Sequence, residues 1–451
     1  MNSLQATGAL ERALPHPTAE RPRRRRPCVK LPAGLGKAAL TAALFVAGAV
    51  LCLSTGTSIA VVADSFSFNV LVILIAMELF TGMLAQTGAM EALAVRLAIL
   101  SRGRLKLLAA LLAGMMFLIS SILNNITAIL VILPCVFVLL RAIEPDRRYL
   151  STLFAVILAV SNLGGAATGV GDLPAVLIVQ SGVVTFADYT LVAFPFFAAS
   201  TAVLVGVWLV VLRVRGRSEG SRPCTLAISV LESQYRHVAV DKRTLVPLAA
   251  ILLAMIAAWM TVPASVMPSD VIAVMGCVVA LVVFLLRGGK ASQVVDMGSV
   301  LTISSFLFIA SCISATGTLD TLVGMLRGAI PDERLFLAAV LLLTSLLAGL
   351  VGAGPAAACC LPIVCELATT AFAAQHVAVM VAYGAAICAG SSLFLWSATA
   401  GFILSGKIDA SGVHDGTGRP FAFGIKDYLG YGLVNYAVQL GLAFLLVIVA
   451  F

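Results

Sequence analysis

Apolar residues fill most of this chain in long stretches, which short polar segments separate. A membrane-spanning helix needs about 20 consecutive apolar residues, and these stretches supply roughly nine to twelve segments of that length. The pattern predicts an all-α polytopic membrane protein embedded in a lipid bilayer. Composition agrees, because 61% of the residues are hydrophobic and only 11% are charged, against about 25% charged residues in soluble proteins. A soluble enzyme is therefore excluded.

The polar segments divide the chain into four regions. Residues 1–36 form an Arg- and Pro-rich tail without an apolar face, for which we expect disorder. Residues 213–244 form a polar, basic linker. We expect a first transmembrane repeat over residues 37–212 and a second one over residues 245–451.

The basic residues indicate the orientation. The formal net charge is +8, and all but Arg327 and Arg334 of the 29 Lys and Arg residues fall in segments that can share one side of the membrane. Positively charged segments near membrane helices stay in the cytoplasm. We therefore expect a multi-pass protein of the plasma or inner membrane whose N-terminus, tail and linker are cytoplasmic. This placement explains the positive charge without a nucleic-acid partner.

The apolar segment between two basic loops predicts a hairpin. Loops 96–106 and 141–148 are both basic, so the segment between them must enter the membrane and return to the same side. It forms either two full spans or a re-entrant helical hairpin. Asn124 and Asn125 lie at its midpoint, and Thr127 follows them. Non-helical backbone at this depth must be buried in protein or line a cavity, so we expect this tip to face other helices, with Asn124, Asn125 and Thr127 as candidate ligands.

A weak internal repeat relates the two halves. Pro134 and Pro362 are 228 residues apart, and the same offset relates Asn124 at the first hairpin tip to Gly352. Counting the membrane crossings between these landmarks gives the two copies opposite orientations. Inverted-topology repeats, each with a re-entrant helical hairpin and a discontinuous helix, are typical of secondary transporters that bind substrate at the middle of the membrane.

The stretch from Ser161 to Pro174 should interrupt a membrane helix. It contains four glycines and a proline, and in a helix interior each Gly costs about 1 kcal/mol and Pro about 3 kcal/mol relative to Ala. Broken helix ends expose backbone groups that an ion can bind. The candidate ligands are Ser161, Asn162, Gly165, Thr168 and Asp172. The alternative is close helix packing through small residues, but packing does not require Asn, Thr and Asp together.

The corresponding stretch of the second half, residues 388–401, has hydroxyl groups but no acid. Its candidate ligands are Ser391, Ser392, Ser397 and Thr399. A binding site and simple packing are about equally supported here. Glu78 and Glu366 also lie in apolar stretches and are alternatives to Asp172 as a proton carrier, because burial raises the pKa of a carboxyl group.

These motifs resemble the ion transporter superfamily, in the branch of NhaD-type sodium/proton antiporters, arsenite permeases and the melanocyte P protein. Residues 161–174, SNLGGAATGVGDLP, are similar to the branch signature SN-x-GG-x-AT-x-x-GD-x-P, and residues 124–127 are similar to its hairpin motif DN-x-T. Residues 390–401 resemble its late Gly/Ser-rich segment. The resemblance implies a scaffold domain, a transport domain with two opposed hairpins, a homodimer and an elevator-like movement.

The chain departs from this family at both hairpin tips. Where the family has Asp-Asn, this chain has Asn124-Asn125 in the first half and Gly352-Ala353 in the second, so Asp172 is the one acid left at a motif position. We expect a secondary active transporter that moves a small ion by alternating access, with Na⁺ or H⁺ as the coupling ion and no other cofactor. Two alternatives are an anion or oxyacid permease, for arsenite or a di- or tricarboxylate, and a transport-inactive paralogue that acts as a membrane scaffold.

Two other classes of protein fit the sequence less well. A channel needs a continuous polar pore, but the polar residues cluster at the middle of the helices. An intramembrane enzyme needs a Ser/His, paired-Asp or metal constellation, and the apolar stretches show none. We therefore expect no enzymatic activity and no metal site.

Overall fold

The computed structural model describes residues 33–101, 104–143, 145–214, 240–289, 297–317, 324–325 and 327–450. These residues fold into helices, and the strand-like structure among them is limited to an isolated bridge between His414 and Pro420. The predicted all-α fold is confirmed. The predicted tail lies outside the described residues up to residue 32, and so do residues 215–239 of the predicted linker.

The first half of the chain contains nine helices among the described residues. They are α2 (Ala33–Thr55), α3 (Ile59–Asp64), α4 (Phe68–Ala85), α5 (Ala89–Leu100), α6 (Leu105–Ser120), α7 (Asn125–Ile143), α8 (Arg147–Ala166), α9 (Leu173–Gln180) and α10 (Phe186–Val214). The second half contains α12 (Lys242–Thr261), α13 (Ser269–Leu286), α14 (Met297–Ala315), α16 (Glu333–Val351), α17 (Ala353–Thr369), the 3₁₀ turn η2 (Ala373–Gln375), α18 (His376–Ser391), α19 (Gly401–Ala410) and α20 (Ile425–Ala450).

Eight of the described helices are long and apolar enough to cross a membrane. They are α4, α8, α10, α12, α13, α16, α18 together with η2, and α20. The protein is therefore a polytopic membrane protein, as predicted. Among them α8 is buried along its whole apolar window, whereas α20 is buried over only 22% of its window. Helix α8, which leads into the first predicted break, is thus the most deeply buried of these eight helices.

The first predicted hairpin consists of α6 and α7, and the second consists of α16 and α17. With 16 residues, α6 is about 24 Å long at about 1.5 Å per residue, which is shorter than the hydrocarbon core of about 30 Å. The tip of the second hairpin is Gly352, whose φ of 103° suits glycine and strains other residues. Helices α7 and α17 begin 228 residues apart, at Asn125 and Ala353, which is the predicted offset.

Both predicted breaks are confirmed. Helix α8 ends at Ala166, residues 167–172 are not helical, and α9 begins at Leu173. Helix α18 ends at Ser391, and α19 begins at Gly401 after a run of turns. The clustered glycines of the first break and the proline after it remove helix stability at this point, which explains why the sequence located it.

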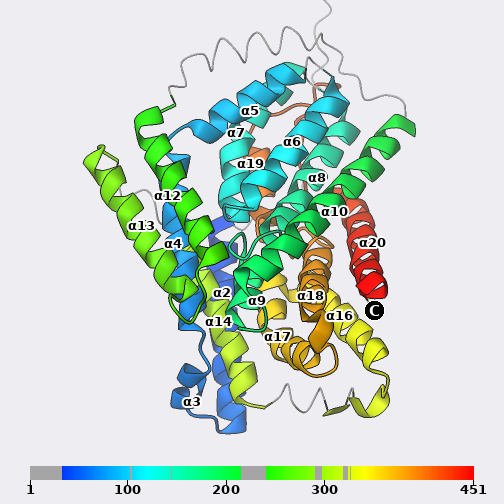
Figure 1. Cartoon of the computed structure of the whole chain (residues 1–451). Helices are drawn as coiled ribbons and strands as arrows, with labels where there is room; N and C mark the ends of the chain where they lie inside the picture. Colours follow the sequence, from blue (N-terminus) through cyan, green and yellow to red (C-terminus); the bar gives the residue numbers. More distant parts are fainter. Residues whose placement is uncertain are drawn as a thin grey trace, which may run out of the picture.

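The helix order of the first half recurs in the second, and the halves exchange partners. Helix α2 packs against α14 and α13 packs against α4, while α9 packs against α17 and α19 packs against α7. Figure 1 shows α5, α6 and α7 towards the upper end of the bundle, and α16 and α17 towards its lower end. Such reciprocal packing is expected for two copies of one unit. Their opposite orientation in the membrane stays a prediction.

Candidate functional site

The first hairpin tip lies directly against the first helix break. Asn125, the first residue of α7, is fully buried, and its Nδ2 donates a hydrogen bond to Asp172 Oδ2 at 2.7 Å. Ser120 Oγ, at the end of α6, has a single proton and is placed to donate it to Asn125 Oδ1 or to the carbonyl of Ser161. The bond to Asn125 Oδ1 leaves the N–H side of the Asn125 amide facing the carboxylate.

Asp172 is the N-cap residue of α9. Its Oδ1 accepts a hydrogen bond from the backbone N–H of Leu173 at 2.8 Å, while its Oδ2 accepts from Asn125. Pro174 suits the first turn of this helix because proline has no N–H to leave unpaired. The carboxylate is half-buried, and each oxygen keeps a lone pair that can accept a proton or a cation.

Two glycines allow the break to come this close to the hairpin. A Cβ atom on Gly165 would lie 2.5 Å from Asn125 Oδ1 and 2.9 Å from Asp172 Cβ. A Cβ atom on Gly171 would lie 2.5 Å from the carbonyl oxygen of Gly165. A side chain at either position would push the hairpin tip and the carboxylate apart. The predicted importance of Gly165 therefore has a steric reason.

The other candidates of the first half hold the break in place. Helix α8 continues through Ser161 and Asn162, so the unwound segment begins later than the start of the predicted stretch. The hydroxyl of Ser161 donates to the carbonyl of Leu158 at 2.7 Å within the same helix. Thr168 lies in the unwound segment and donates to the carbonyl of Ser121 at the hairpin tip.

Asn162 connects the two halves through Ser392. Its Nδ2 donates to Ser392 Oγ at 3.3 Å, and Gln439 Nε2 of α20 donates to the same oxygen at 3.2 Å. The carbonyl of Ser392 accepts the hydroxyl of Tyr428 at 2.7 Å. These four side chains are buried. Ser392, the first residue of the second break, is thus held by Asn162 of the first half and by Gln439 and Tyr428 of α20.

Ser391 and Ser397 stabilise the second break from inside. The hydroxyl of Ser391 donates to the carbonyl of Cys388 in the last turn of α18 at 3.1 Å. Ser397 Oγ accepts the backbone N–H of Phe394 at 3.1 Å and is placed to donate to the carbonyl of Ser391 at 3.1 Å. These bonds give both hydroxyls a structural role in the loop.

Two predicted ligands, Thr399 and Thr127, take part in none of the hydrogen bonds described above. Thr399 is exposed, and Thr127 is half-buried in the first turn of α7. Asn124 acts mainly on the backbone, because its Oδ1 accepts the N–H of Ile126 at 3.0 Å at the start of α7.

The tip of the second hairpin reaches both breaks. A Cβ atom on Gly354 would lie 2.8 Å from Leu173 Cδ2, and one on Gly352 would lie 3.8 Å from the carbonyl oxygen of Ser397. Gly352 provides no side-chain cap for α17. The two hairpin tips and the two breaks therefore meet in one region of the bundle, which we call the central cluster.

Sequence reasoning missed three residues of the central cluster. Ser120 supports Asn125, while Gln439 and Tyr428 hold Ser392. Gln439 is a polar residue in the middle of the largely apolar helix α20, and polar groups within the membrane usually face other helices. That signal was present in the sequence. The hydroxyls of Ser120 and Tyr428 carried none.

The alternative acids lie on two other helices. Glu78 is buried in α4. Glu366 of α17 forms an ion pair with Arg327 at 3.0 Å, with both side chains partly exposed. Among the described residues, no three His, Cys, Asp or Glu side chains are grouped as metal ligands. At the central cluster, Asp172 supplies the carboxylate that a cation would bind, beside backbone, hydroxyl and amide oxygen atoms.

The comparison with protein families settles the assignment of the chain. The citrate transporter family, CitMHS, matches residues 34–384, which include both hairpins and the first break. The chain belongs to the CitMHS citrate transporter family. This family is part of the ion transporter superfamily, so the resemblance inferred from the motifs is confirmed.

Several individual proteins are also similar to parts of this chain. An uncharacterized transporter of Mycobacterium bovis is 26% identical over 255 residues, which are 56% of this chain and 58% of that protein. The P protein of Mus musculus is 33% identical over 151 residues, 34% of this chain and 17% of that protein. The magnetosome protein MamN of Paramagnetospirillum magneticum is 27% identical over 184 residues, 40% of each chain. This chain therefore matches little more than half the length of the mycobacterial relative.

Proposed function

We propose that this protein is a secondary active transporter that carries a small carboxylate anion of the citrate class, coupled to a cation bound at Asp172. The observation that carries the proposal is the meeting of both hairpin tips and both helix breaks in the central cluster, where Asn125 donates a hydrogen bond to Asp172. Transporters bind their substrates where broken helices of two repeats meet. The membership in the CitMHS family supports the citrate class of substrate.

The helix ends of the central cluster favour an anion. Helix α17 begins at the tip of the second hairpin without a side-chain cap, and N–H groups at a helix N-terminus attract negative charge. Helix α9 also begins here, but Asp172 already caps it. A carboxylate substrate would therefore bind best near the tip of α17.

If the substrate is a carboxylate, its binding requires a coupling cation on Asp172. A carboxylate substrate and the Asp172 carboxylate repel each other in a region of low dielectric constant. A proton or Na⁺ on Asp172 removes this repulsion, so the cation and the anion bind together. The Asn125 amide keeps the carboxylate in place whether or not the cation is bound.

Alternating access is the transport mechanism that we propose for the two halves. If the recurring helix order reflects two inverted repeats, the central cluster opens to one side or the other as the hairpins move against α2, α4, α13 and α14. We expect an elevator-like movement within a homodimer, as in the superfamily that the motifs resemble.

A second candidate function is Na⁺/H⁺ exchange without an organic substrate. The observation that favours it is the carboxylate–amide pair of Asp172 and Asn125, because an ionisable residue within a membrane helix bundle is typical of proton and cation pathways. In this case Asp172 would bind Na⁺ and H⁺ in turn.

Transport in proteoliposomes separates the two functions. The purified protein is reconstituted, and uptake of radiolabelled citrate is measured with an inward gradient of H⁺ or Na⁺, with empty liposomes as control. Gradient-driven citrate uptake supports the proposal. Dissipation of a pH gradient by Na⁺ without citrate supports the second candidate. If neither occurs, both functions are wrong, and the transport-inactive scaffold becomes the better account.

A further inference from the structure

Helices α2 and α14 pack against each other and run parallel. Thr41 Oγ1 of α2 lies 3.1 Å from Thr302 Oγ1 of α14, and further along both helices the ring centroids of Phe45 and Phe308 are 5.2 Å apart. From the first contact to the second, the chain advances in the same direction in both helices. The residues near the C-terminal end of α2 therefore face those near the C-terminal end of α14.

Two cysteines meet at this end of the contact. Cys52 of α2 and Cys312 of α14 are buried free thiols in one small apolar cluster, and they hydrogen-bond to each other. Gly48 lies one turn before Cys52 on the same face of α2, and a Cβ atom there would lie 2.7 Å from Phe308 Cε1 and 3.1 Å from Cys312 Sγ. The missing side chain lets α14 approach closely enough for contact between the two thiols, which we call the thiol pair.

A short helix covers the thiol pair. Helix α3 has six residues, of which Val62 is buried against the two cysteines, while Val61 beside it is 46% exposed. The hydroxyl of Ser311 on α14 is placed to donate to the carbonyl of Ser65 at the end of α3, at 3.2 Å. A helix this short is marginally stable by itself. The thiol pair is thus shielded by a short cover and not by the depth of the bundle.

The thiol pair lies at the end of the molecule that we predict to face away from the cytoplasm. Cys52 and Cys312 each lie three residues before the end of their helix. Helix α2 has 23 residues, enough to cross a bilayer, so a cytoplasmic tail before it places its other end outside. Figure 1 shows α3 at the lower end of the bundle and α5 at the upper end. Disulfides form and persist in oxidising compartments outside the cytoplasm.

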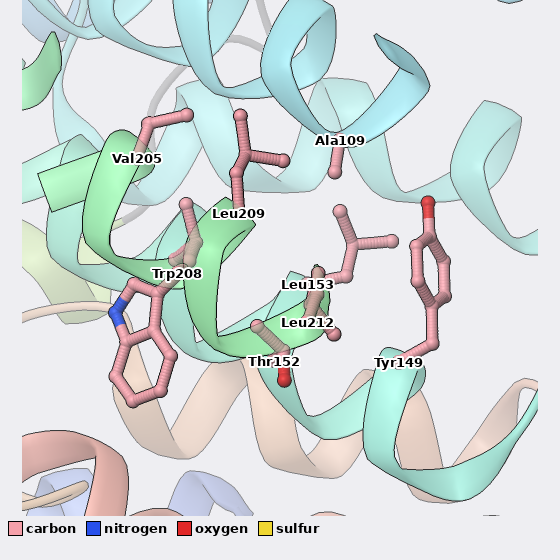
Figure 2. A pocket seen from close by; sticks show the side chains of 9 residues that line it. Ala109, Tyr149, Thr152, Leu153, Val205, Trp208, Leu209 and Leu212 are labelled. Atoms are coloured by element: carbon pink, nitrogen blue, oxygen red, sulfur yellow. The ribbon is translucent and has the colours of Figure 1, made fainter. Parts of the chain in front are cut away.

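The pocket between α6, α8 and α10 contrasts with the thiol pair. Figure 2 shows its side chains, which are mostly apolar, and it has room for about one water molecule. The hydroxyls of Tyr149 and Thr152 donate to backbone carbonyls, and the indole N–H of Trp208 donates to Asn435 Oδ1. The polar side chains of this pocket are engaged within the protein, whereas the thiol pair brings two groups together that can react with each other.

We propose that Cys52 and Cys312 are a site of oxidation, at which a disulfide fastens α2 to α14. The oxidant is a second disulfide, R–S–S–R. The thiol of Cys52, which at 9% is the more exposed of the two, loses its proton and attacks one sulfur of R–S–S–R, whose S–S bond breaks, and R–S⁻ takes up the proton and leaves as R–SH. The thiolate of Cys312 then attacks the Cys52 sulfur of the mixed disulfide, and the second R–S⁻ leaves with the proton of Cys312. The two cysteines lose two electrons, and the oxidant is reduced to two R–SH.

Peptide mapping of the full chain tests this proposal without any variant. The protein is extracted from membranes in N-ethylmaleimide, which blocks free thiols, and is purified without reductant. A second sample is reduced, incubated with oxidised glutathione and then blocked. Mass spectrometry should show peptides joined through Cys52 and Cys312, which dithiothreitol separates. N-ethylmaleimide on both cysteines in both samples would overturn the proposal, and so would a bond from Cys52 to a different cysteine.

Cysteine variants separate the thiol pair from the other thiols. Reduced wild type and the control Cys277→Ala, which removes a buried thiol of α13, should form the bond in oxidised glutathione. Because a cross-link restricts the unfolded chain, their unfolding midpoints should rise by several degrees, and dithiothreitol should reverse the rise. Cys52→Ala and Cys312→Ala should show no such rise. An equal, reversible rise in either of these two variants would contradict the proposal.

The cover is tested by the rate of oxidation. Val62→Ala removes the buried contact of α3, so the thiol pair should react with oxidised glutathione several-fold faster than in wild type and give the same product. Val61→Ala is the matched control, because this neighbouring side chain is exposed, and its rate should equal that of wild type. Equal rates in V62A and V61A would overturn the role of α3 as the cover of the site.

Discussion

Asn125 Nδ2 donates a hydrogen bond to Asp172 Oδ2 at 2.7 Å, and this bond joins the tip of the first hairpin to the start of α9. The two residues are 47 positions apart, and neither lies in a regular helix interior. A movement of the hairpin relative to the break would have to stretch or replace this bond. The hydrogen bond between Asn125 and Asp172 therefore links the position of the hairpin to the binding of a proton or a cation by the carboxylate.

Removal of the Asn125 amide should impair transport more than stability. In Asn125→Ala the carboxylate loses a hydrogen bond of a kind that contributes about 1.5–3 kcal/mol, so we expect gradient-driven flux to fall by about tenfold or more. Asn124→Ala is the matched control, because Asn124 caps the backbone of α7 and does not contact Asp172. Equal flux in the two variants would show that the amide has no special role.

Gly165→Ala should destabilise the protein by overpacking. The new methyl group would meet Asn125 Oδ1 and Asp172 Cβ, and overpacking in a well-packed core costs about 1–3 kcal/mol. Gly206→Ala in α10 is the control, because a Cβ atom there meets nothing within 4 Å. Thermal unfolding in detergent should give a lower midpoint for G165A and an unchanged or higher midpoint for G206A. A G165A midpoint equal to that of G206A would mean that the break is looser than described.

Ser392→Ala should reveal the coupling between the halves. The substitution leaves the amides of Asn162 and Gln439 buried without their shared partner, and each unsatisfied group costs about 1–3 kcal/mol. In a double-mutant cycle with Gln439→Leu, the combined loss of stability should be smaller than the sum of the single losses. Additive losses would show that the two residues act independently.

The loop between α19 and α20 should depend on pH through Asp415. Burial by itself would raise the pKa of this carboxyl, but hydrogen bonds from Thr417 and from the N–H of Arg419, with Arg147 nearby, hold the pKa below its usual value of 3.8. Because the folded carboxyl binds its proton less tightly than the unfolded one, its contribution to stability is present above the usual pKa and is lost as the pH falls through the lowered pKa.

Hydrogen exchange of residues 411–421 measures this effect. The loop should be protected near neutral pH and should lose protection below the usual pKa of a carboxyl group. Asp415→Asn should have the same protection factor across this range, relative to the intrinsic exchange rate at each pH, at a level closer to that of the acidified wild type. A wild-type loop whose protection is independent of pH down to this range would contradict the assignment.

The sequence predicted the interruptions of the helices better than the contacts between them. Gly165, Gly171 and Pro174 act locally on helix stability, so the break after α8 could be placed without a structure. The bond between Asn125 and Asp172 depends on how the first hairpin packs against the break between α8 and α9, which no local pattern encodes.

Side-chain direction also limited the prediction. Thr399 lies in the predicted stretch but is exposed, because the turns that follow α18 do not keep a helical periodicity. Gln439 contacts Ser392 from α20, 47 residues further along the chain, and no sequence pattern indicated that α20 packs against α18.

The most direct test of the central claim is the comparison of wild type and Asp172→Asn in gradient-driven citrate uptake, with fold integrity checked by the unfolding midpoint and by size-exclusion chromatography. The asparagine keeps the shape of the side chain but cannot bind a proton or a cation as a carboxylate does. We predict that the variant folds and is purified like wild type, and that its coupled uptake falls to the level of empty liposomes. A well-folded Asp172→Asn protein with undiminished coupled uptake would contradict the account.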